Sequence, residues 1–215
     1  MNDTPSSAGT RHAAHHDAHH DAHAHADHGG GLASMAAAAT LHCLTGCAIG
    51  EILGLMIGTA VGLAAGATIG LSVALAFLFG YALSSLSLLR SGLSLRAALT
   101  LVLAADTVSI LTMEIVDNLV MAAIPGAMDA GLVNAVFWVG MSISLVAAFA
   151  AAYPVNRYLL SRGKGHALTH AHHGASGAIT GWRRFIPDLP APALAAAIGA
   201  FMLGGLVVAV ADGLA

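Results

Sequence analysis

Charged side chains are scarce in this sequence of 215 residues. Asp, Glu, Lys and Arg make up 9% of the chain and hydrophobic residues make up 57%, whereas an average soluble protein is about 25% charged. So little charge excludes a nucleic-acid-binding protein and a water-exposed α/β enzyme, because both need more solvated surface. We therefore expect an integral membrane protein with the lipid bilayer as its surroundings, no nucleic-acid partner and no enzymatic activity.

Cysteine is also rare, and the two that occur are Cys43 and Cys47, four residues apart in an apolar run. On one helix their Cβ atoms would lie about 5–6 Å apart, whereas a disulfide requires about 3.5–4.5 Å. We therefore expect free thiols. The sequence also contains no GxxxxGK[ST] motif. We therefore expect no ATP binding by a P-loop and no transport driven in that way.

Long apolar runs dominate what remains, and about 20 apolar residues suffice to cross a bilayer. Residues 35–89 contain a single acid, Glu51, and must hold two helices with a turn near residues 64–68. Further helices are expected from about 95 to 124, where Pro125 and Gly126 follow, from about 132 to 158, and from about 191 to 210. The fold class is thus all-α, a polytopic transmembrane helical bundle of about five helices.

The expected organisation has four parts. Residues 1–31 form a disordered tail rich in His and Asp, residues 35–160 a four-helix membrane core, residues 161–190 a loop, and residues 191–213 the fifth helix. Positive charge sets the orientation, because Lys and Arg are retained on the cytoplasmic side. All eight basic residues fall on one side of this five-helix chain, which predicts a bacterial inner-membrane protein with a cytoplasmic N-terminus: Arg11, Arg90, Arg96, Arg157, Arg162, Lys164, Arg183 and Arg184.

Glycine recurs at every fourth position from Gly46 to Gly70. Small residues at this spacing let two helices approach closely in lipid. We expect most of the row to be a helix-packing surface. Because five helices are few for a complete pore, we also expect a homo-oligomer with this row as its contact.

Two groups of polar side chains lie inside the apolar runs, where each ionisable group costs at least about 2.5–3.5 kcal/mol at the bilayer centre. In the first, Cys43, Cys47 and Glu51 form one stripe of a helix, with His42 beside its cytoplasmic end. The second fills about half the circumference of the third helix, and this half cannot face lipid: Asp106, Met113, Glu114, Asp117, Asn118 and Met121. We expect the first group in the inner half of the membrane, Asp106 near mid-depth and the rest of the second group further outward, so that the two form one route across.

Cys, His and Met suit Cu(I), and Cys, His and carboxylate accept Zn(II). We therefore expect a transition-metal site, copper or zinc, formed by His42, Cys43, Cys47, Glu51, Met113, Glu114 and Asp117, with Asp106 and Asn118 as relay groups. Met121 is better interpreted as packing material. The alternative is that the buried acids share protons or bond backbone and amide groups.

Histidine clusters are a further compositional signal for metal binding. The tail carries His12, His15, His16, His19, His20, His23, His25 and His28, and the loop carries His166, His170, His172 and His173. Neutral imidazoles bind Zn, Ni, Cu and Co alike, so the clusters do not identify the metal. Both are predicted on the same side of the membrane.

Several stretches together resemble a known family. They are LHCLTGCAIGEILG, LLRSGLSLRAAL, ADTVSILTMEIVDN with IPGAMDAGL, and FWVGMSISLVAAFAAAYPVNRYLLSRGKGHA. They resemble the bacterial membrane proteins grouped as domain of unknown function 4396, over about residues 36–173. The resemblance implies a helical membrane domain and assigns no reaction to any residue.

The prediction for function is that the protein binds a transition-metal ion, copper in preference to zinc or nickel, and translocates or buffers it. Two alternatives stay open. One is a non-transporting helper, sensor or assembly subunit whose buried polar groups specify helix pairing. The other is a thiol redox protein, against which the CxxxC spacing argues, since thiol oxidoreductases favour CxxC.

Overall fold

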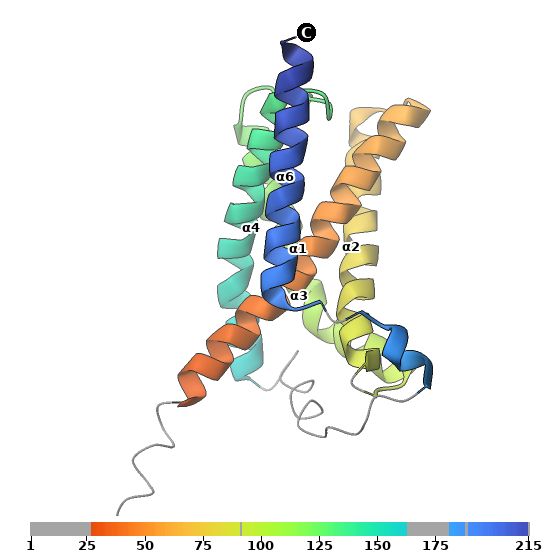
Figure 1. The fold of residues 1–215 in the computed structure, drawn as a ribbon, viewed down its shortest axis with the longest axis vertical. Coiled ribbons are helices and arrows are strands. Elements are labelled where there is room, and N and C mark those ends of the chain that lie inside the picture. The colour runs from red at the N-terminus through yellow and green to blue at the C-terminus, as the bar shows by residue number, and fades with distance from the viewer. Residues whose placement is uncertain (1–26, 91, 163–180, 188, 215) are drawn as a thin grey trace, which may run out of the picture.

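Five long helices make up most of the computed structural model, which describes residues 27–90, 92–162, 181–187 and 189–214. They are α1 (Asp27–Val61), α2 (Ala65–Arg90), α3 (Leu95–Ala123), α4 (Ala135–Ser161) and α6 (Ala191–Gly213), with a short 3₁₀ helix, η1 (Gly181–Phe185), before α6. Each of the five is long and apolar enough to cross a membrane. They run alternately up and down (Figure 1), which confirms the all-α transmembrane bundle.

The start of the first helix and the first turn differ from expectation. Helix α1 begins at Asp27, so residues 27–31 are helical and do not belong to a disordered tail. The run of Ala residues after Met35 favours helix, and the helix extends from it towards the N-terminus.

The turn between α1 and α2 occupies residues 62–64, slightly before the expected position. Gly62 has a positive φ of 71°. The N–H of Leu63 donates to the Gly58 carbonyl at 2.8 Å and that of Gly62 to the Thr59 carbonyl at 3.2 Å. This pair of bonds is a Schellman motif, which ends a helix at a glycine.

Four glycines of the row bring α1 against α2. A Cβ atom at Gly46 would overlap the backbone of Gly80, one at Gly50 the backbone of Ala76, one at Gly54 the residue Ser72, and one at Gly58 the side chain of Thr68. The packing function of the row is therefore confirmed for these four. Since α2 covers these four, they are not available as a contact between two copies of the chain; the homo-oligomer itself stays a prediction.

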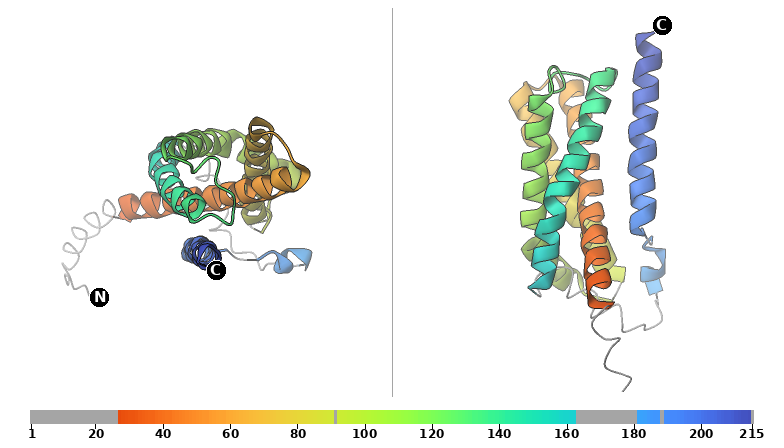
Figure 2. Two further views of the ribbon diagram at one scale, coloured as in Figure 1. Left: turned by 90° about the horizontal axis from the view of Figure 1, so that it is seen from above. Right: turned by 90° about the vertical axis from the view of Figure 1, so that its left-hand side faces the viewer.

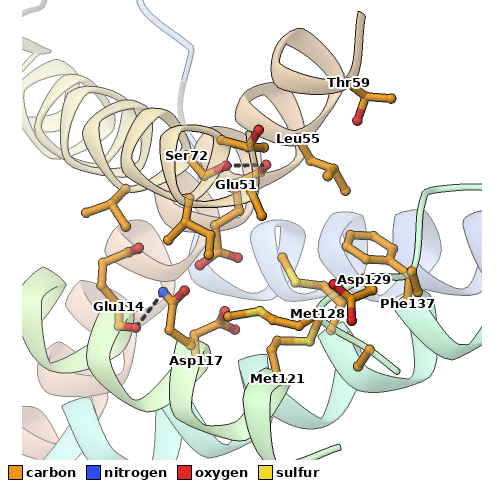
Figure 3. Close-up of a pocket in the computed structure, with 18 of the residues that line it drawn as sticks. Glu51, Leu55, Thr59, Ser72, Glu114, Asp117, Met121, Met128, Asp129 and Phe137 are labelled. Carbon is orange, nitrogen blue, oxygen red and sulfur yellow. Dashed lines mark hydrogen bonds between the residues drawn. The ribbon is translucent and has the colours of Figure 1, made fainter. Parts of the chain in front are cut away.

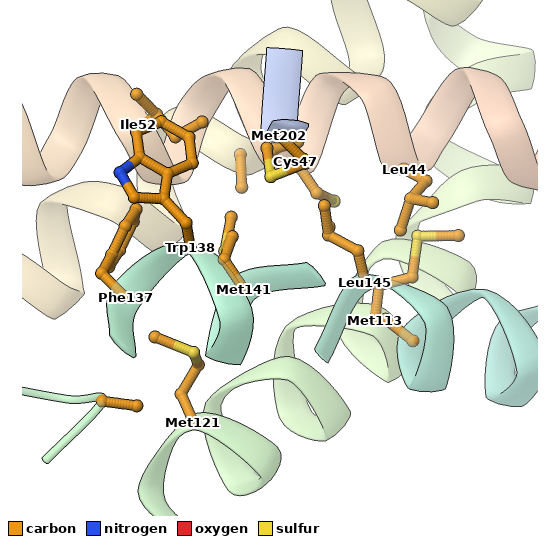
Figure 4. Packing of buried hydrophobic residues seen from close by; sticks show 14 of the residues in the cluster. Leu44, Cys47, Ile52, Met113, Met121, Phe137, Trp138, Met141, Leu145 and Met202 are labelled. Atoms are coloured by element: carbon orange, nitrogen blue, oxygen red, sulfur yellow. The ribbon is translucent and has the colours of Figure 1, made fainter. Parts of the chain in front are cut away.

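The main apolar core lies between α1, α3 and α4 (Figure 4). Leu44 and Ile52 of α1 pack there with Leu145 and Trp138 of α4. The Trp138 indole donates to the Leu132 carbonyl at 2.7 Å, so its N–H is satisfied despite burial. This core fixes how far α3 and α4 stand from α1.

Helix α6 stands beside the four-helix core and packs against α1 and α4 (Figure 2). Gly205 lies directly against the Trp138 ring, and Phe201 meets the same ring with centroids 5.7 Å apart. Most of the α6 surface is exposed on the molecule, as in Val207 and Val208. It is thus a lipid-facing helix that covers one side of the core.

Because the helices alternate in direction, the α2–α3 turn and the C-terminal end of α4 lie at one end of the bundle, with the start of α1 (Figure 1). We call this the basic end, defined by Arg90, Arg96, Arg157 and Arg162. Arg90 there donates to the Ile186 carbonyl at 2.7 Å, which ties the segment before α6 to α2. The α1–α2 and α3–α4 turns lie at the opposite end.

Candidate functional site

Helix α3 has one polar, buried face and one apolar, exposed face. Asp106, Glu114 and Asp117 are buried, at 2%, 3% and 5% exposure, whereas Leu111 and Leu119 on the other face are exposed. Met113 and Met121 are buried as well, and Asn118 is half-buried. The expectation that this half of α3 faces away from lipid is confirmed.

Cys43 lies opposite Asp106. Its Sγ is 3.9 Å from the Ser84 hydroxyl of α2, and Asp106 and Ser109 of α3 lie within interaction range of the thiol. Both Cys43 and Cys47 are free and buried, as expected from their spacing.

The next two turns of α1 meet the next two polar positions of α3. Cys47 interacts with Glu114, and Glu51 interacts with Asp117 and Glu114. Asp117 also accepts a hydrogen bond from the Ser144 hydroxyl of α4. We call the residues Cys43, Asp106, Cys47, Glu114, Glu51 and Asp117 the polar column.

The two polar groups therefore run side by side, and the expected end-to-end arrangement was wrong. Cys43 lies level with Asp106, and Glu51 lies level with Asp117. Packing through α2 accounts for this register, because Gly46 of α1 lies against Gly80 of α2 and Gly80 in turn lies against the Ile110 side chain of α3. Ile110 is one helical turn from Asp106, and Gly46 is one turn from Cys43, so the two groups are held at the same level.

At the basic end, the column is followed by a buried polar pair. The Asn156 amide of α4 donates to the Thr40 hydroxyl of α1 at 2.8 Å, and Thr40 donates to the Ala36 carbonyl at 2.7 Å. Thr40 is one helical turn from Cys43, so buried polar groups extend from the basic end towards Glu51. Sequence reasoning missed this pair, although a lone Asn in the apolar run of α4 was a visible signal.

His42 is not part of the column. Its ring Nδ1 lies 2.8 Å from the Ala38 carbonyl on its own helix, and the adjacent Cys43 side chain turns towards α2 and α3. Among the residues that the structure describes, no three His, Cys, Asp or Glu side chains are arranged to hold a metal ion together. His42, Cys43 and Cys47 thus do not form one ligand set.

The histidine clusters lie largely beyond the described structure. His12, His15, His16, His19, His20, His23 and His25 precede residue 27, and His166, His170, His172 and His173 fall within 163–180. His28 is on the first turn of α1, and its side chain is not described. Their predicted metal binding stays a prediction.

A pocket of about 320 Å³ opens towards the end opposite the basic end. Its mouth is lined by Thr59 and Leu63 near the α1–α2 turn and by Met128 and Asp129 in the α3–α4 segment. Glu51, Glu114 and Asp117 lie at its inner part (Figure 3). Three carboxyl groups from α1 and α3 therefore line the inner part of one open pocket, although within the described residues they are not arranged as a set that holds a metal ion.

Two of these carboxyl groups have unsatisfied oxygens. Within the described part of the chain, no donor forms a hydrogen bond with either side-chain oxygen of Glu51 or Glu114; Cys47 lies near Glu114 without forming one of good geometry. The neighbouring polar bonds go to backbone: Ser72 donates to the Glu51 carbonyl at 3.3 Å and Asn118 to the Glu114 carbonyl at 2.9 Å. Buried oxygens of this kind normally require a donor, water or an ion.

Met113, expected as a ligand, is buried in the apolar core beside Leu145 (Figure 4) and does not line the pocket. Met121, interpreted as packing, does line it, together with Met128 and Met141. Met128 and Met141 could not be singled out from the sequence, because their approach to the column depends on how α3, α4 and their connection fold.

Comparison with known proteins places the chain in a family. No curated protein and no solved structure matches the sequence. Residues 33–165, which include α2, α3, α4 and every member of the polar column, match the family described as Domain of unknown function (DUF4396). The match covers more than half of the chain, and the chain therefore belongs to that family.

Proposed function

We propose that this protein binds a transition-metal cation in the pocket and passes it along the polar column through the membrane. The observation that carries the proposal is that Glu51, Glu114 and Asp117 line the inner part of one open pocket, where no hydroxyl or N–H donor reaches either oxygen of Glu51 or Glu114 among the described residues. Carboxylates inside a bilayer are costly and require compensation. A cation entering the pocket supplies that compensation.

The polar column offers successive binding positions for such an ion. From the pocket floor the next donors are the Cys47 thiol and then Cys43 with Asp106 and Ser84, and Thr40 with Asn156 follows towards the basic end. Because thiol, carboxylate and hydroxyl groups follow one another along the column, an ion could exchange one ligand for the next as it moves. Copper is favoured over zinc and nickel because two thiols lie on the route, and the histidine clusters fit a role in collecting or releasing the ion.

The charge distribution supports an orientation for this path. The described arginines lie at the basic end, which we assign to the cytoplasmic side of a bacterial inner membrane by the positive-inside rule. The N-terminus is then cytoplasmic, and the pocket opens on the outer side. Without a P-loop motif in the sequence, the ion's own gradient, a coupled ion or a partner protein would drive transport.

The helper interpretation predicts that the buried polar groups are satisfied by one another, since they would serve only to pair helices. Glu51 does lie against Asp117 and Glu114 against Cys47. However, both glutamates open into the pocket and no hydroxyl or N–H donor reaches their carboxyl oxygens within the described residues, which argues against the helper interpretation. The thiol redox interpretation requires access of a disulfide to a thiolate. Cys43 and Cys47 are only 1% and 2% exposed. A disulfide therefore cannot reach either sulfur, which argues against the thiol redox interpretation.

Metal uptake into proteoliposomes tests the proposal. Glu51→Gln and Glu114→Gln keep side-chain size but remove charge and proton exchange, and we expect each to slow uptake at least about tenfold, the equivalent of about 1.4 kcal/mol. Asp212→Asn is the matched control, because Asp212 is an exposed acid at the end of α6. Equal uptake by wild type and both Gln variants, or no uptake of any metal by the wild type, would contradict the proposal.

A further inference from the structure

Three methionines from three elements line the pocket beside its carboxyl groups. Met121 lies on α3, Met128 in the segment between α3 and α4, and Met141 on α4. Met121 and Met141 are buried, whereas Met128 is 40% exposed at the mouth. Figure 3 shows Met121 and Met128 on the same side of the pocket as Asp117 and Asp129.

The surroundings of two of these thioethers hold them close to the column. The Met141 sulfur is 4.0 Å from the Ser144 hydroxyl, which donates to Asp117. Met121 lies over Gly140, where a Cβ atom would come within 3.1 Å of its sulfur. The glycine therefore leaves the room that the Met121 thioether occupies between α3 and α4.

The position of these methionines differs from that of Met113. Methionine is a common gap-filler in apolar cores, and Met121 and Met141 do belong to the main apolar core, but with Met128 they also border a pocket whose floor is acidic. Glu114 supplies an independent sign of a missing ligand, because it is 3% exposed, lines the same pocket, and has no hydrogen-bond donor to either oxygen within the described chain. A group that binds both sulfur and carboxylate is therefore expected between them.

We infer that the pocket is a loading site for a soft monovalent cation, Cu(I), with Met121, Met128 and Met141 as thioether ligands and the carboxyl groups as charge compensation. This inference rests on the proposed function and specifies its substrate. Neutral thioethers favour Cu(I) over Zn(II) and over alkali ions, because soft sulfur ligands select soft metals. A carboxylate then balances the single positive charge in the low dielectric of the pocket.

X-ray absorption at the copper edge tests the ligand assignment directly. We would load the full chain, in which Cys43→Ser and Cys47→Ser remove both thiols, with one equivalent of Cu(I). Any sulfur neighbour of copper is then a thioether, whereas the histidine clusters supply nitrogen neighbours only. The expected result is a copper–sulfur shell that is lost when Met121→Leu, Met128→Leu and Met141→Leu are combined.

The matched control is Met202→Leu, which removes a buried methionine from α6 outside the pocket and should leave the shell intact. Methionine-to-leucine changes nearly conserve volume and cost less than about 1.5 kcal/mol each, so a thermal melt separates lost ligands from lost fold. We also expect the triple variant to lower Cu(I) affinity at least about tenfold, or about 1.4 kcal/mol, while its Zn(II) affinity stays within twofold of wild type.

The outcomes separate this inference from the proposed function. A sulfur shell that survives the triple substitution, or a parent protein with no sulfur neighbour of copper, overturns the thioether site. If Zn(II) uptake still depends on Glu51 and Glu114, the proposed function stands without the thioether site. Loss of both metals in the folded triple variant also overturns the inference, because the thioethers would then give no selectivity.

Discussion

Helix α1 approaches α2 so closely at Gly50 that no side chain fits between them. A Cβ atom there would overlap the backbone nitrogen and Cα of Ala76, and backbone atoms within a helix cannot move aside individually. Gly50→Ala therefore forces the two helices apart. We expect this single methyl group to destabilise the protein and to disturb the polar column.

The magnitude follows from two opposing effects. Replacing a helical glycine by alanine gains about 0.5–1 kcal/mol where space is free, whereas overpacking a tight core costs about 1–3 kcal/mol or more. Because the overlap at Gly50 is with backbone, the cost lies at the upper end, and we expect a net loss of about 1–2 kcal/mol. Gly70→Ala is the matched control, since a Cβ atom at Gly70 on α2 meets nothing within 4 Å.

Reversible unfolding in mixed micelles measures both variants on the same scale. Gly50→Ala should unfold more easily than wild type, and Gly70→Ala should be unchanged or more stable by up to about 1 kcal/mol. Separation of α1 from α2 also withdraws Ser84 from Cys43, so metal uptake should fall in Gly50→Ala alone. Equal stability of the two variants would refute the argument that the glycine row exists for close backbone contact.

Three further predictions concern the column, the tail and the orientation. Ser144→Ala leaves Asp117 without its hydroxyl donor and should cost about 1–3 kcal/mol of unfolding free energy. The control is Ser142→Ala, which removes a hydroxyl that donates to the Trp138 carbonyl on its own helix and should cost less than about 0.5 kcal/mol. Comparable losses would contradict the role given to Ser144. Deletion of residues 1–26 should lower the total copper bound, measured by elemental analysis, yet leave Cu(I) in the pocket, and a truncated protein that binds none would remove the pocket site. A single cysteine introduced at Met128 in a Cys43→Ser, Cys47→Ser background should react with an impermeant thiol reagent from outside the cell, and labelling only after lysis would reverse the proposed orientation.

The fold could be predicted from the sequence because apolar length and helix-ending residues are local signals. Helix α3 ends at Ala123, before Pro125 and Gly126, as these residues indicate. The polar face of α3 was likewise visible, since Asp106, Glu114 and Asp117 share one side of a 3.6-residue helix. These features depend only on neighbours along the chain.

The partners across helices could not be predicted in the same way. Which turn of α1 meets which turn of α3 depends on how both pack against α2, where Gly80 lies between Gly46 and Ile110. The place of Ser144 beside Asp117 and of Met141 at the pocket depends on the rotation of α4, which the core around Trp138 and Leu145 determines. The glycine row could be recognised as a contact surface, but its partner α2 became known only from the structure.

The carboxyl groups of α3 also constrain how the protein enters the membrane. Asp106, Glu114 and Asp117 together oppose insertion of an isolated α3 by up to about 8–10 kcal/mol, the translocon-scale cost of three acids at the helix centre. Each centrally placed Leu, Ile or Val offsets about 0.3–0.6 kcal/mol of this. Their interaction partners are Cys43 and Glu51, synthesised earlier on α1, and Ser144, synthesised later on α4. Helix α3 is therefore a poor substrate for the insertion machinery until α1 is beside it, and its release into lipid should wait for the synthesis of α4.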